Sequence, residues 1–116
     1  MSYDIHFGVK VEGMDGYVAV IDEPYVAHPT YNLGQMFRAC TGWNFSQSEW
    51  YNCAEVLPKI QKGLTELKFH RKAYEKYNPP NGWGSIDSAI KALSSMEEKM
   101  SEIVDQIPLE HLWVQW

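Results

Sequence analysis

The sequence predicts a single α+β domain, in which a small antiparallel sheet of about three strands is covered by two long antiparallel helices and one short helix. Three observations carry this prediction. The start of the chain alternates apolar and polar residues, the middle and later parts repeat apolar residues every three or four positions, and the last residues alternate again. Strands and helices that are segregated along the chain are typical of α+β folds. The length of 116 residues fits one domain over 1–116.

The sheet is predicted from the two ends of the chain. In "YDIHFGVKV", residues 3–11, apolar and polar side chains alternate, which is typical of a half-buried strand. The glycines of "EGMDG" and the β-branched run after them predict a hairpin to a second strand over 17–26. The closing "EHLWVQW" alternates Leu112 and Val114 against His111 and Trp113, so a third strand is expected over 111–116.

Two amphipathic stretches predict the long helices. Over 54–77, apolar side chains recur at helical spacing with Lys and Arg between them, and Pro58 is expected in the first turn. Over 85–107, apolar side chains follow one another in steps of three and four, with Ser85 as the N-cap and Pro108 as the end. The connection between them is short, so we expect an antiparallel pair.

A short helix is expected between the hairpin and the long helices. Asn32 or Thr30 could cap it, and Gly42 ends it. The aromatic stretch "WNFSQSEWYN", residues 43–52, follows no regular period, and Ser46 or Ser48 is expected to cap the next helix.

Composition excludes several classes of protein. The net charge of −5 argues against a protein that grips the phosphate backbone of nucleic acid, so no direct nucleic-acid binding is expected. No run approaches the ~20 apolar residues of a membrane helix, and the polar start is unlike a signal peptide. Cys40 and Cys53 form no zinc-binding spacing. We expect a cytoplasmic protein with reduced thiols, although a disulfide between the two stays open.

No constellation predicts catalysis, a metal site or a cofactor. The four histidines lack metal-ligand spacing; His6 and His111 belong to candidate neighbouring strands, and His70 to a solvated basic helix face. Cys53 lies at a helix start, where the pKa of a thiol can be lowered, but no base stands beside it. Ser85 lacks the glycine that completes a nucleophile elbow. We therefore expect no enzyme.

Recognition is better supported than catalysis. "HPTYNLG" and "NPPNGWGS" each place an aromatic residue and an asparagine where a helix begins. Helix starts bind anions through unpaired N–H groups, and an aromatic face stacks on a base with about 1–3 kcal/mol. The same side chains suit protein interfaces. These observations predict a ligand-binding site formed by Tyr31, Asn32, Asn81 and Trp83. The alternative is that these aromatic side chains only close the edge of the core.

The predicted helices leave one face and one edge of the sheet open. Asp4, His6, Lys10 and Trp113 would share that face. An exposed aromatic side chain on an open sheet predicts a homo-oligomer or a partner surface.

Five stretches together resemble a family of short proteins of bacteriophages, prophages and their bacterial hosts. They are "MSYDI", "TYNLGQMFRA", "WYNCAEVLPKIQKGLTEL", "YEKYNPPNGWGSIDSAIKAL" and "IPLEHLWVQW". The resemblance covers almost the whole chain, but its motifs name no chemistry. It implies a small phage-type accessory protein that acts in the host cytoplasm against a defence system.

The predicted site and this resemblance lead to one functional hypothesis with alternatives. The protein is expected to be non-enzymatic and to bind and sequester a small nucleotide signal of host defence. In the first alternative, it inhibits a host defence protein complex, such as a nuclease effector, by binding it directly. In the second, it is a structural or interaction protein with no small ligand.

Overall fold

The computed structural model describes residues 5–10, 17–19, 31–46, 49–79 and 84–115. These residues form an α+β fold with one antiparallel sheet, as the sequence predicts. The strand order across the sheet is β2-β1-β4-β3, and each neighbouring pair is antiparallel. The strands are β1 (His6–Lys10), β2 (Tyr17–Ala19), β3 (Trp50–Asn52) and β4 (Trp113–Gln115).

The register of the sheet separates an inner face from an outer face. Val114 of β4 lies opposite Phe7 on one side and Tyr51 on the other. Phe7 and Val114 are fully buried, and Tyr51 packs against the core. On the other face, His6 and Lys10 are exposed as expected. Trp113 is half-buried rather than exposed, so the expected open face is confirmed only in part; Asp4 lies outside the described residues.

The strand β3 is a correction to the expected sheet of about three strands. It arises from the aromatic stretch in which the sequence shows no period, because Trp50 and Tyr51 are adjacent aromatic residues that do not alternate with polar ones. Tyr51 fixes it from the inner face by packing edge-on against Trp43, with ring centroids 5.1 Å apart. At its end, Asn52 caps the next helix by accepting a hydrogen bond from the backbone N–H of Ala54 at 3.0 Å. The expected caps, Ser46 and Ser48, are therefore wrong.

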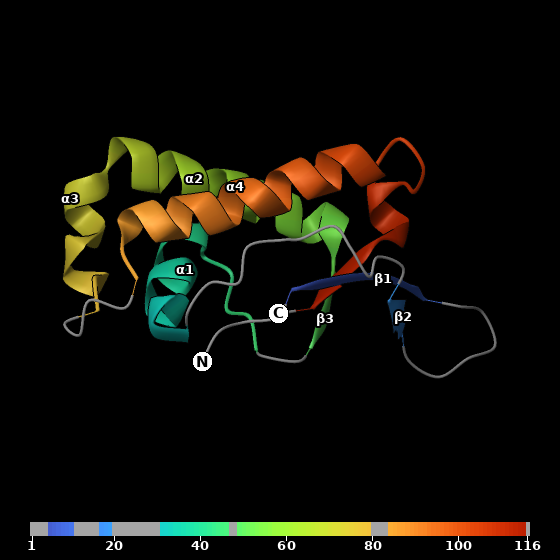
Figure 1. Cartoon of the computed structure of the whole chain (residues 1–116), viewed down its shortest axis with the longest axis horizontal. Helices are drawn as coiled ribbons and strands as arrows, with labels where there is room; N and C mark the ends of the chain where they lie inside the picture. The colour runs from blue at the N-terminus through green and yellow to red at the C-terminus, as the bar shows by residue number, and fades with distance from the viewer. Residues whose placement is uncertain (1–4, 11–16, 20–30, 47–48, 80–83, 116) are drawn as a thin grey trace.

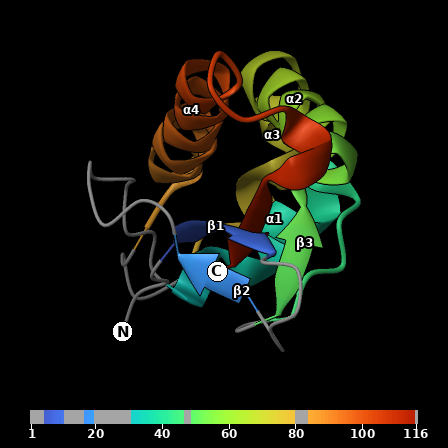
Figure 2. The same ribbon diagram turned by 90° about the vertical axis from the view of Figure 1, so that its right-hand side faces the viewer.

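The two long helices lie side by side in one layer, and two different elements lie beneath them (Figures 1 and 2). The helix α2 (Cys53–Phe69) and the helix α4 (Ile86–Ile103) run antiparallel. The sheet lies beneath one half of this layer, and α1 (Gly34–Thr41) lies beneath the other half (Figure 1). The helices therefore overhang the sheet, and the molecule is elongated, with extents of 46 × 26 × 24 Å.

The caps of α1 and the position of Pro58 in α2 can be compared with the sequence predictions. The 3-10 helix η1 (Tyr31–Leu33) precedes α1, so Leu33 rather than Asn32 or Thr30 occupies the N-cap position. Gly42 ends α1 as expected, with a left-handed φ of 68°. Pro58 lies beyond the first turn of α2, contrary to expectation. The helix accepts it at the cost of one backbone hydrogen bond, since a proline nitrogen has no proton to donate.

The first long helix ends at Phe69 and not near Tyr77. His70 leaves the helical conformation, and the chain continues as α3 (Arg71–Tyr74) and the 3-10 helix η2 (Glu75–Tyr77). Tyr74 and Tyr77 pack against the core after the break. Their burial redirects the chain, and because neither glycine nor proline marks the turn, the periodicity of the sequence gives no sign of it.

The last helix begins as expected and ends early. The Ser85 hydroxyl caps α4 by accepting a hydrogen bond from the backbone N–H of Ser88 at 3.2 Å. The helix ends at Ile103, four residues before the expected end, and turns lead into the 3-10 helix η3 (Leu109–His111). His111 is therefore not part of the closing strand. This early end turns the chain back so that β4 can enter the sheet between β1 and β3.

Candidate functional site

The turn between α2 and α3 gathers basic side chains around an exposed aromatic ring. α2 ends at Phe69, and α3 begins two residues later. An open hollow of about 490 Å³ lies at this turn, lined by Lys68, Phe69, His70, Arg71, Lys72 and Ala73. We refer to these six residues as the basic corner.

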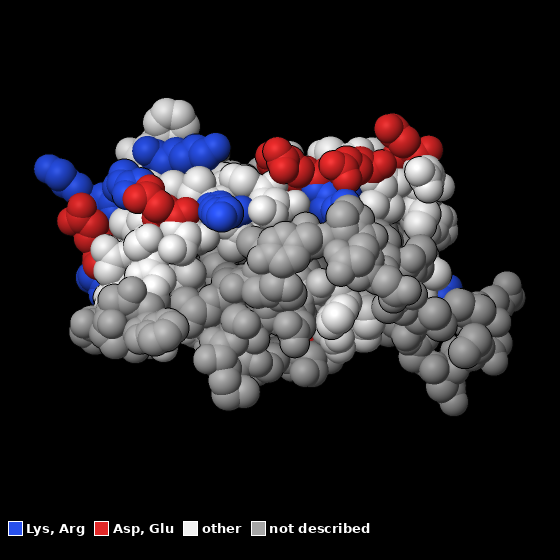
Figure 3. All heavy atoms as spheres, viewed as in Figure 1, with Lys and Arg blue, Asp and Glu red and all other residues white. Residues whose placement is uncertain are grey.

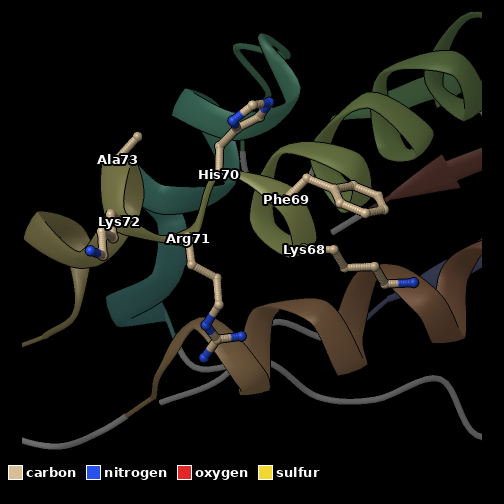
Figure 4. A pocket seen from close by; sticks show the side chains of 6 residues that line it. All are labelled: Lys68, Phe69, His70, Arg71, Lys72 and Ala73. Atoms are coloured by element: carbon tan, nitrogen blue, oxygen red, sulfur yellow. The ribbon is translucent and has the colours of Figure 1, made fainter.

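The side chains of the basic corner fan outward and do not converge on one point (Figure 4). Lys68 and Phe69 point in one direction, Lys72 points away from them, and Arg71 reaches toward α4 (Figure 4). The Phe69 side chain is 77% exposed, although burial of a phenyl ring is favourable. The corner is therefore an open surface on which an exposed aromatic side chain lies next to cationic ones, and this suits an extended partner better than an enclosed small ligand.

Two side-chain contacts hold the corner in place. Arg71 Nη1 lies 3.0 Å from Asp87 Oδ1 in the first turn of α4. Tyr74 Oη donates a hydrogen bond to Glu66 Oε2 at 3.1 Å, which ties α3 back to α2. Burial, followed by the nearby Glu66 carboxylate, raises the pKa of Tyr74, so its hydroxyl stays protonated and able to donate. The turn is thus fixed to both long helices.

The basic corner is the centre of a longer cationic segment. Residues 59–76 carry a net charge of +4 in a chain whose total is −5. The cations of this segment are Lys59, Lys62, Lys68, Arg71, Lys72 and Lys76. A local potential of this sign attracts anionic partners even though the whole chain is acidic.

The structure describes only part of the site that the sequence predicts. Tyr31 and Asn32 both belong to η1, where Asn32 is exposed. Asn81 and Trp83 lie outside the described residues. The residues that follow them are described: Gly84 has a φ of 104°, a left-handed conformation that favours glycine, and Ser85 caps α4. The grouping of the four residues in one site stays a prediction.

The basic corner is the feature that sequence reasoning missed. Its stretch, "KFHRKAYEK", has the composition of a solvated helix face, and the break at His70 is silent in the sequence. The signal that could have found it is Phe69, which follows the buried Leu67 by two residues and so falls off the apolar stripe of α2.

The structure also places the thiols and histidines that the sequence offered for catalysis or metal binding. Cys40 and Cys53 are both free thiols in the core. Burial raises the pKa of each to about 12, the opposite of the lowering considered for Cys53 at a helix start. His6 lies opposite Gln115 in the sheet, so it does not face His111. Across the described segments, no group of three or more His, Cys, Asp or Glu residues is arranged to hold a metal ion.

The comparisons with known proteins add no relative. No protein-family model, no curated protein and no solved structure matches this chain. Among the helices that the structure describes, none is long and apolar enough to cross a membrane.

Proposed function

We propose that this protein acts by binding and without turnover, and that it counters a host defence system by docking on an acidic surface of a defence protein. One observation carries the proposal: the basic corner presents Phe69 at 77% exposure within a cationic segment of an otherwise acidic chain. Aromatic side chains, Phe included, are enriched at the buried centre of protein interfaces, and charged side chains belong to the rim. The resemblance to short phage and prophage proteins supports the setting of host defence.

The parts of the corner have different roles in this proposal. Phe69 would fill an apolar depression on the partner, where its ring leaves water. Lys68 and Lys72 are exposed and point in different directions, so they would pair with carboxylates on two sides of that depression. Arg71 already pairs with Asp87, so its role is to hold the corner in shape.

Phage growth on bacteria that carry individual defence systems tests this function. Expression of the protein should restore plaque formation on at least one such host. Phe69→Ala and the double variant K68E/K72E should both lose this effect while remaining folded. The double variant K10E/K91E changes the net charge equally at exposed positions outside the corner and outside the cationic segment, so it should retain the effect. Equal protection by F69A and the unchanged protein would contradict the proposed surface.

The second candidate function is the sequestration of a nucleotide signal. The observation that favours it is the position of the basic corner: the Arg71–Asp87 ion pair connects the corner to the first turn of α4, immediately after the segment that contains Asn81 and Trp83. In this function, Trp83 or Tyr31 stacks on the base, and cationic side chains with helix-start N–H groups hold the phosphate.

Calorimetry separates the two functions. A panel of cyclic and linear nucleotides is titrated into the unchanged protein and into Trp83→Ala. Micromolar or tighter binding that is lost in W83A and kept in F69A, with both variants folded, supports the nucleotide function. If no nucleotide binds and protection still requires Phe69, docking on a protein is supported.

A further inference from the structure

Charge is separated along the ridge that α2 and α4 form. Figure 3 shows most of the Lys and Arg side chains over the half near α3, with some carboxylates among them, and a group of Asp and Glu side chains over the half where α4 ends. We refer to the residues at the carboxyl end of α4 as the acidic end: Glu97, Glu98, Glu102, Val104 and Asp105.

The acidic end departs from the usual charge pattern of a helix. The carboxyl end of a helix carries a partial negative charge and favours Lys or Arg, but the last turn of α4 contains neither. Glu98 and Glu102 are exposed and lie four residues apart in α4, so their carboxylates share one face and repel each other, and exposed Asp105 follows just after the helix ends. Lys99 is nearly buried and its ammonium group pairs with the Glu102 carboxylate at 2.9 Å. Lys99 therefore does not neutralise Glu98 or Asp105. A cationic surface docked here would relieve this repulsion.

Each end of the ridge also exposes an apolar side chain. Two large hydrophobic side chains are exposed in the described part of the chain: Phe69 at 77% in the basic corner, and Val104 at 41% in the acidic end. Each end therefore combines one exposed apolar side chain with nearby charges that are mostly of one sign, positive at the basic corner and negative at the acidic end. Surfaces of this type complement each other in both charge and hydrophobicity.

We propose that copies of this protein associate head to tail, with the basic corner of one copy docked on the acidic end of a second copy. Charge complementarity selects this occupant because each chain carries both matching surfaces. A polyanion such as DNA would match the cations but would leave Val104 and the acidic end uncovered. The two surfaces lie toward opposite ends of a ridge in a molecule 46 Å long, so each contact leaves one free surface on each copy, and the contact builds open chains. This proposal does not rest on the proposed defence partner, although both associations would use the basic corner and would therefore exclude each other there.

Sedimentation velocity at several protein concentrations tests the proposal. At about 0.05 M salt the average mass should rise with concentration, and at about 1 M salt, where charges are screened beyond about 3 Å, the protein should be a monomer. K68E/K72E reverses the charge of the basic corner, and E98K/D105K removes the net charge of the acidic end, so each variant alone should be monomeric at low salt. An equimolar mixture of the two should associate again, since each then supplies the surface that the other lacks.

The controls make each outcome decisive. K10E/K91E carries the same net charge as K68E/K72E but keeps both ends, so it should still associate. All the substituted side chains are exposed, and circular dichroism verifies that each variant is folded. A wild-type protein that stays monomeric at low salt overturns the proposal, and so does a mixture that stays monomeric. Loss of association in K10E/K91E would also overturn it, because net charge would then be the cause. None of these results bears on the plaque assay with F69A, so the two proposals fail separately.

Discussion

Replacement of Gly63 by alanine should destabilise the protein, although alanine is the better helix former. Gly63 lies in α2 where it meets α1 and α4. A Cβ atom at this position would lie 2.6 Å from Thr41 Cγ2, closer than real Cβ contacts, and 3.2 Å from both Cys40 Sγ and Leu93 Cδ1. The Thr41 side chain cannot simply rotate, because its hydroxyl donates to the backbone carbonyl of Phe37 at 2.6 Å and accepts from the backbone N–H of Trp43 at 3.0 Å.

The magnitude follows from two opposing terms. Alanine gains about 0.8–1.0 kcal/mol over glycine inside a helix, whereas overpacking a tight core costs about 1–3 kcal/mol. Because the closest methyl group is held by hydrogen bonds, the cost should fall in the upper part of that range. We therefore expect Gly63→Ala to lower the free energy of unfolding by about 1–2 kcal/mol.

Thr41→Ser provides the matched control, because serine keeps the hydroxyl and removes Cγ2. Urea denaturation of the four proteins of a double-mutant cycle measures the coupling. T41S alone should cost about 1 kcal/mol for the lost methyl group. In the T41S background, G63A should be neutral or stabilising, since the new Cβ enters the space that Cγ2 leaves. An equal effect of G63A with Thr41 in place and in the T41S variant would refute the reasoning, and so would an increase in stability when G63A is introduced alone.

Three further predictions concern local features. Because burial raises the pKa of Cys40 and Cys53 to about 12, both thiols should resist alkylation in the native state and react on unfolding. The free energy of unfolding should also fall as pH rises from about 9 toward 12, since the thiols of the unfolded chain lose their protons first. Cys53→Ala should reduce this fall. Gly42→Ala should cost about 1–2 kcal/mol in urea denaturation, because the φ of 68° suits glycine, and a loss below a few tenths would contradict this. Asp87→Ala should change the free energy of unfolding by less than about 1 kcal/mol, since the side chains of its ion pair are 45% exposed for Arg71 and 80% exposed for Asp87. A larger loss would contradict this, because the pair would then stabilise the whole fold and not only the turn.

Periodicity accounts for the parts of the fold that were predicted correctly. The alternation around Phe7 and Val114 and the apolar stripes of the two long helices each extend over enough residues to reveal a buried face. The local chemistry of Ser85 and Gly42 likewise fixes where α4 starts and α1 ends. These are properties of a short stretch of chain, which the sequence displays directly.

Tertiary contacts account for the parts that were missed. The strand β3 exists because Tyr51 packs against Trp43 and pairs with Val114, which are distant or irregularly spaced in the sequence. The end of α2 at Phe69 depends on the burial of Tyr74 and Tyr77 after the turn. The basic corner depends on that break, so it could not be predicted from a pattern that runs smoothly through it. The predicted grouping of Tyr31, Asn32, Asn81 and Trp83 also requires tertiary placement, and it stays a prediction.

Photo-crosslinking from position 69 tests the central claim most directly, namely that the basic corner is the surface that recognises a defence protein. A photoreactive phenylalanine analogue replaces Phe69 in one protein and exposed Lys10 on β1 in another, and both are expressed in the host in which the unchanged protein restores plaques. We predict that position 69 forms an adduct with a component of that defence system, that K68E/K72E abolishes this adduct, and that position 10 forms none. An adduct to the defence component from position 10 with none from position 69 would contradict the account.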